Sequence, residues 1–90
     1  MAFFVVTYDL RKKGEFDYQP LWDDLSHMDA VKFQESNYFL STESTREKIK
    51  NHLKQFIHEH DLLMVVEFYK KPDYTKALKG TNDWVNTHWP

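Results

Sequence analysis

The chain has 90 residues, 41% of them hydrophobic and 17% aromatic, and its formal net charge is -2. This composition is too apolar for a disordered chain, and the length allows one domain with a limited core, which makes association of two copies a reasonable expectation. The slightly acidic balance argues against a protein that coats nucleic acid by bulk electrostatics, so any such contact has to be local.

Two absences narrow the class of protein further. The sequence contains no cysteine, which excludes a disulfide, a thiolate nucleophile and a zinc–thiolate site. No apolar run approaches the roughly 20 residues that a membrane-spanning helix needs, and the N-terminal residues do not have the pattern of a secretory signal. We therefore expect a soluble, cytoplasmic protein without a membrane partner.

The first third of the chain predicts a strand followed by a helix. Residues 3–8 form a short run rich in Phe and Val that ends at charged residues, a pattern typical of a strand buried on at least one face. Leu21, Leu25 and Met28 then recur at spacings of 4 and 3, which favours an amphipathic helix with Asp17 as its cap. We expect this helix to pack on the sheet.

The next segment, residues 30–42, alternates less regularly. A polar break at residues 35–37 fits two short strands joined by a turn or bulge, and one long bent strand is the alternative. Ser44 and Glu47 have the spacing of a capping box, with Ser44 as the cap, so a second helix is expected to begin there. The apolar stripe of that helix consists of Ile49, Leu53, Phe56 and Ile57.

A continuous apolar run at residues 62–66 predicts a last strand, buried in the centre of the sheet. The order strand, helix, strand, strand, helix, strand is that of an α+β, ferredoxin-like βαββαβ domain over residues 1–69, with a four-stranded antiparallel sheet and two helices on one face. Residues 70–90 form a C-terminal extension whose aromatic content predicts docking on its own domain or on a partner subunit. Its large apolar residues are Tyr74, Leu78, Trp84, Val85 and Trp89.

The candidate site is the end of the first strand, where Asp9 is followed by three cations, Arg11, Lys12 and Lys13. A lone carboxylate binds a divalent cation weakly, because magnesium requires six oxygen ligands. A two-fold axis near the strand end would supply Asp9 twice and bring Arg11 and Lys13 close to a bound phosphate. The alternatives are that Asp9 only holds local amides in a turn and that the cations form a solvated loop.

Other polar and aromatic residues have simpler interpretations. His58 and His60 are two positions apart and do not share a helix face, which argues against a metal site. Trp84 and Trp89 have the chemistry to stack on bases, but packing is the more frequent use of such residues. The basic residues of the second helix are typical of a solvated face.

Four stretches within residues 2–69 carry a resemblance to a known family: VVTYDL, the segment VKFQESNYFL, the helix TREKIKNHLKQFI and the run DLLMVVEF. Together they resemble the CRISPR-associated protein 2 family and its stand-alone SinR-like relatives. Its most specific elements are Asp9 directly after Tyr8 and the pair Gln34 and Ser36.

The resemblance implies a ferredoxin-like homodimer in which the two Asp9 carboxylates hold one magnesium ion at the interface, with Tyr8 and Ser36 beside the site. It implies a magnesium-dependent endonuclease or endoribonuclease acting on DNA or RNA, with Asp9 as the catalytic residue. The residues expected to contact nucleic acid are Tyr8 and Ser36 beside that site and the cations Arg11, Lys12 and Lys13 of the following loop. The acidic net charge and the Trp-rich tail depart from that family. The alternative function is a non-catalytic homodimeric module that binds nucleic acid or another protein.

Overall fold

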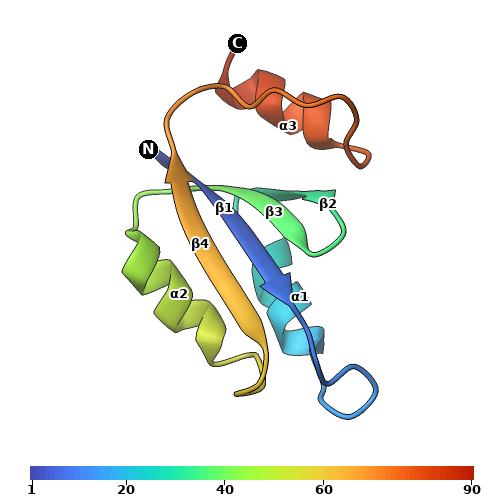
Figure 1. The fold of residues 1–90 in the computed structure, drawn as a ribbon. Helices are drawn as coiled ribbons and strands as arrows, with labels where there is room; N and C mark the ends of the chain where they lie inside the picture. Colours follow the sequence, from blue (N-terminus) through green and yellow to red (C-terminus); the bar gives the residue numbers. More distant parts are fainter.

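The structure is a computed structural model that describes all residues from 1 to 90. It contains four strands and three helices (Figure 1): β1 (Ala2–Asp9), α1 (Gln19–Ser26), β2 (Ala30–Gln34), β3 (Asn37–Thr42), α2 (Arg46–Lys54), β4 (Leu62–Phe68) and α3 (Thr81–His88). The strands form one antiparallel sheet in the order β2-β3-β1-β4. The predicted α+β class and the four-stranded antiparallel sheet are confirmed, and the arrangement is compatible with a ferredoxin-like fold.

The core lies between the sheet and the helices α1 and α2. Side chains alternate along β1, so Phe4, Val6 and Tyr8 are buried on the helical face while Asp9 is exposed on the opposite face. Each fully buried large apolar side chain contributes about 1.5–3 kcal/mol to folding. The side chains that are almost completely buried are Phe4, Leu21, Leu25, Leu40, Leu53, Val6 and Thr81.

Both helices of the core begin near the predicted positions, but their caps differ. In α2 the cap is Thr45, whose backbone is extended and whose hydroxyl accepts the Lys48 N–H at 3.2 Å, so the prediction that Ser44 is the cap was wrong by one residue. Before α1, the Asp17 carboxylate accepts the Gln19 N–H at 3.0 Å. Asp17 therefore supports the first turn of α1 from one position before the cap.

The prediction that the last strand is buried in the centre of the sheet was wrong. β4 lies at an edge, where it pairs with β1 alone. Leu63 and Val65 pack against the core, whereas the alternate side chains of Leu62, Met64 and Val66 are 54%, 58% and 44% exposed. A continuous apolar run therefore has one face on the core here and its other face in solvent.

The C-terminal extension docks on its own domain. It ends in α3, which lies across the sheet on the face opposite α1 and α2 (Figure 1). Trp89 packs on Phe3 with ring centroids 4.1 Å apart, and Trp84 stacks on Phe39 at 5.9 Å. The sequence pattern predicts no helix here, because most of the residues of α3 have low helix propensity. The aromatic contacts hold it instead.

Candidate functional site

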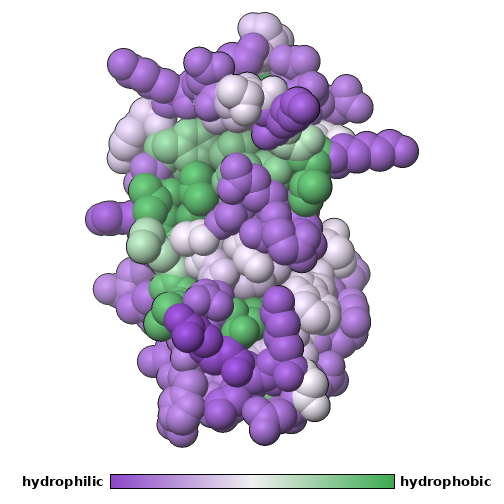
Figure 2. Space-filling view, turned by 45° about the vertical axis from the view of Figure 1, so that its right-hand side comes forward, coloured by the Kyte–Doolittle hydropathy of each residue, from purple (hydrophilic) through white to green (hydrophobic).

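The sheet face opposite α1 and α2 has a covered half and an uncovered half. The covered half consists of Phe3, Phe39 and Phe68, which lie beneath the aromatic rings of α3 and the residue that follows it. The uncovered half contains Leu62, Met64 and Val66 of β4, here named the uncovered strip. Figure 2 shows hydrophobic side chains at the surface below α3, interrupted and rimmed by hydrophilic ones.

The strand pairing sets Asp9 at one end of the uncovered strip. Asp9 lies opposite Leu62 in the β1–β4 register, and Thr7 lies opposite Met64. A shallow open depression is lined by these four residues together with Tyr8 and Leu63. Apolar side chains and a carboxylate therefore share one exposed surface.

Asp9 is ion-paired with Arg11, since the Arg11 Nη2 and Asp9 Oδ2 atoms are 3.0 Å apart and both side chains are 56% exposed. The prediction that Asp9 ends β1 beside a cation is confirmed. Such an exposed pair contributes little to stability because water screens it. No group of three His, Cys, Asp or Glu side chains is arranged to hold a metal ion.

The main chain of the loop after β1 is held by Asp61, the residue before β4. Its Oδ1 accepts the Arg11 N–H at 2.6 Å, and its Oδ2 accepts both the Tyr18 hydroxyl and the His58 N–H at 2.7 Å. Tyr18 in turn accepts the Lys12 N–H at 3.2 Å. The backbone at two of the three cations is therefore fixed, while the side chain of Lys13 remains exposed.

These hydrogen bonds also shift two pKa values. Burial alone would raise the pKa of Asp61, but the hydrogen bonds donated by Arg11, Tyr18 and His58 outweigh it, and the pKa lies below its ordinary value. The pKa of Tyr18 is raised, first by burial and then by its bond to Asp61. Sequence reasoning missed both residues, because the contact between Asp61 and Arg11 spans 50 positions and depends on the pairing of β1 with β4.

Tyr8 and Ser36 lie close to each other but differ in their relation to Asp9. The Tyr8 ring is buried on the helical face, where its hydroxyl accepts the Trp22 indole N–H at 3.3 Å, and burial with the nearby Tyr38 raises its pKa. Its backbone N–H donates to the Ser36 carbonyl at 3.1 Å. The sheet thus separates the Tyr8 side chain from Asp9, while the main chain of Ser36 lies beside β1, next to the strand end.

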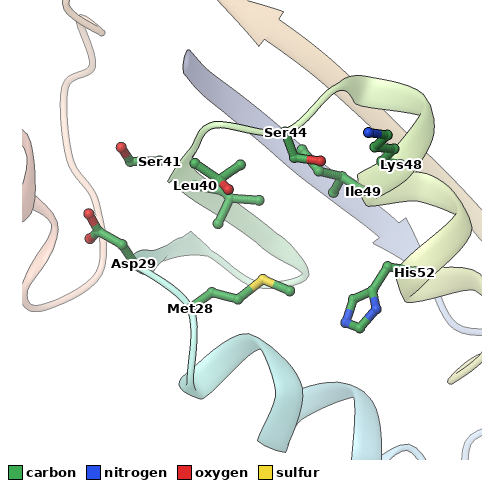
Figure 3. Close-up of a pocket in the computed structure, with 9 residues that line it drawn as sticks. Met28, Asp29, Leu40, Ser41, Ser44, Lys48, Ile49 and His52 are labelled. Carbon is green, nitrogen blue, oxygen red and sulfur yellow. The ribbon is translucent and has the colours of Figure 1, made fainter. Parts of the chain in front are cut away.

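A second hollow lies on the helical side, between the end of α1 and the start of α2 (Figure 3). It has a volume of about 210 Å³, with Met28, Leu40 and Ile49 as its apolar lining. His52 of α2, which lines the hollow, contacts Asp24 of α1, with Nε2 and Oδ2 2.9 Å apart. This contact joins the two helices beside the hollow, which is at the sheet end away from Asp9.

Three findings bear on the class of protein. No protein-family model and no solved structure matches this chain. None of the three helices has the length and apolar character that crossing a membrane requires.

Proposed function

We propose that the protein is a homodimeric module that assembles through the uncovered strip and binds nucleic acid at the loops after β1 of both copies, without cleaving it. The observation that carries the proposal is the strip itself. Three large apolar side chains stand half-exposed in a row on one face of the edge strand β4. Leaving them in water costs free energy that contact with a matching apolar surface recovers.

A second copy of the chain fits this surface because a two-fold interface is self-complementary. The apolar side chains of one strip meet those of the other, and the end of each strip carries both signs of charge, in Asp9 and Arg11. The small core supports the same inference, since 14 of the 90 residues are buried in the single chain. A domain of this size gains stability by association.

Nucleic acid fits the loops after β1 because cations lie there beside the strip. Lys12 and Lys13 follow Arg11 in the loop. The Asp61 carboxylate holds the backbone N–H of Arg11, and the Tyr18 hydroxyl, which is itself bonded to Asp61, holds that of Lys12. Two copies double the number of cations on one side of the dimer. A local cluster of this kind binds phosphates although the net charge of the chain is -2.

The test of the dimer is sedimentation equilibrium on the wild type, Met64→Lys and Leu78→Lys. Met64 is 58% exposed in the strip, and Leu78 is 43% exposed outside it. We expect a dimer for the wild type and Leu78→Lys, and a folded monomer for Met64→Lys. A wild type that stays monomeric up to its solubility limit refutes the proposal.

The test of nucleic-acid binding is fluorescence anisotropy with a short single-stranded RNA and a short duplex DNA. We expect the double substitution Lys12→Ala and Lys13→Ala to weaken binding and reduce its salt dependence, because fewer counterions are released. Asp9→Ala is expected to bind as well as the wild type or better, since it removes a negative charge. Equal binding by the lysine variant and the wild type contradicts the assignment of the loop.

The second candidate is the magnesium-dependent nuclease that the family resemblance implies. It is favoured by the position of Asp9 at the end of the strip, since dimerisation there brings two carboxylates toward one interface. Magnesium titration followed by NMR of residues 8–13, in the wild type and Asp9→Ala, tests it. Saturable shifts that vanish in Asp9→Ala, with cleavage that is lost in parallel, favour the nuclease. Absence of shifts at millimolar magnesium favours the binding module.

A further inference from the structure

The position of α3 depends on side-chain contacts more than on the helix itself. The helix has eight residues, its cap is Gly80 in a left-handed conformation with a φ of 93°, and no side chain caps it. Helices this short are unstable alone, and Asn, Asp, Thr and Val add little helix propensity. What anchors the helix to the sheet therefore determines whether the covered half stays covered.

A single carboxylate anchors two residues of α3. Asp29, just before β2, accepts the Trp84 indole N–H on Oδ1 at 2.9 Å and contacts the His88 Nε2 with Oδ2 at 2.8 Å. The other ring nitrogen of His88, Nδ1, lies 2.8 Å from the Trp84 carbonyl oxygen. The His88 side chain is 15% exposed, so water has limited access to it.

The two hydrogen-bond partners of His88 determine the protonation state of its ring. A carboxylate and a backbone carbonyl can only accept hydrogen bonds, so both ring nitrogens have to donate for both contacts to be favourable. Only the imidazolium ion has two N–H groups. In either neutral tautomer one nitrogen lone pair would face an oxygen lone pair at 2.8 Å. The observed geometry is that of the charged ring.

We propose that His88 is a protonation-dependent clasp, which holds α3 over the covered half of the sheet as an imidazolium and loosens it when the ring becomes neutral. Asp29 is the charged group that faces the ring from the turn before β2. From β1 the ring of Phe3 faces it edge-on at 5.7 Å, and from α3 the ring of Trp84 stacks on it at 4.1 Å.

The direction of the pH effect follows from the environment of His88. Burial alone would lower the pKa of His88, but the Trp84 carbonyl and the Asp29 carboxylate outweigh it, and the pKa lies above its ordinary value of 6.5. A raised pKa in the closed state means that the clasp is at full strength below the ordinary pKa and is lost as the pH rises through the raised one. Attachment of α3 therefore weakens toward alkaline pH.

Release of α3 would uncover Phe3, Phe39 and Phe68 on the same face as the uncovered strip. The apolar surface would then extend across the full width of the sheet. If the strip is a dimer interface, as proposed above, this widening enlarges the area available to a second copy. The clasp itself does not depend on the dimer, and it can be tested in the monomeric Met64→Lys variant.

The first measurement is an NMR titration of the histidine side chains. We expect the pKa of His88 to lie above its ordinary value of 6.5. In Asp29→Asn, which keeps an oxygen acceptor and removes the charge, the pKa of His88 is expected to fall to the ordinary value or below. The matched control is Asp83→Asn, because Asp83 is an acidic residue in the first turn of α3 that does not contact His88. This substitution should leave the pKa of His88 raised.

The second measurement is amide hydrogen exchange of Trp84 and Trp89, whose N–H groups bond to Gly80 and Val85. Their protection factors should fall as the pH rises, by about tenfold for each unit by which the pKa of His88 exceeds its ordinary value of 6.5. In His88→Gln the protection should be low and independent of pH. A pKa of His88 at or below its ordinary value, or a flat protection profile in the wild type, overturns the proposal.

Discussion

Phe3 and Phe68 are paired at one end of the β1–β4 ladder and lie beneath a tryptophan, whereas Thr7 and Met64 are paired nearer the other end, where no part of the chain covers Met64. Both pairs lie on the same face of the same two strands. The difference is that the chain supplies its own cover, α3, for one half of the face. An apolar sheet face is thus covered from within the molecule on one side and left exposed to solvent on the other.

Substitution in the covered half should have the largest effect on the stability of the single chain. Trp84→Ala removes the stacking on Phe39 and the hydrogen bond to Asp29. We expect it to lower the free energy of unfolding by about 3 kcal/mol, near the low end of the range for buried aromatic residues because Trp84 is partly exposed. Urea unfolding of the monomeric Met64→Lys background measures this.

The matched substitution in the open half is Met64→Ala in the same assay, made on a Val66→Lys background to keep the chain monomeric. Met64 buries little in one chain, so we expect a change within about 0.5 kcal/mol. A loss as large as that of Trp84→Ala would mean that the strip is already covered within the monomer.

An intermediate effect, below that of Trp84→Ala and above that of Met64→Ala, is expected at the end of the open half, where Asp61→Asn weakens three hydrogen bonds that hold the loop after β1. The expected loss is about 1–3 kcal/mol at neutral pH. Because the pKa of Asp61 is lowered in the folded state, its contribution is present above the ordinary value of 3.8 and is lost as the pH falls below it. The wild type and the variant should therefore converge in stability on acidification. A difference in stability that persists at low pH would contradict the explanation that the ionised Asp61 carboxylate stabilises the loop.

A small effect is also expected for Arg11→Gln, which breaks the exposed ion pair with Asp9. Thermal unfolding should report a change below about 1 kcal/mol, because water and salt screen this pair. If salt dependence of unfolding disappears in this variant, the pair is stronger than its exposure indicates.

Features of the fold that follow from local sequence patterns could be predicted from the sequence. The alternation of residues 3–8 and the apolar stripes of both core helices indicate the strand, the helices and their packing, because these patterns follow from local geometry. Asp9 at a strand end next to cations is predicted for the same reason. These features depend on neighbours within a few positions.

Features that depend on distant residues were not predictable in this way. A continuous apolar run such as residues 62–66 is compatible with a strand buried on both faces and with an edge strand that leaves one face open. The clasp between Asp29 and His88 spans 59 positions, and the bond between Asp61 and Arg11 spans 50. Their partners are brought together by strand pairing and by the docking of α3, which local patterns do not encode.

We propose above that a second copy covers the open half of the sheet face. NMR amide shifts of the wild type, recorded over a dilution series, test this dimer. We expect concentration-dependent shifts at Thr7, Leu62, Met64 and Val66, with the amides of α3 unchanged at a pH that keeps His88 charged. Shifts confined to α3 or to the helical face, or no shifts at any concentration, would contradict a dimer formed through β4.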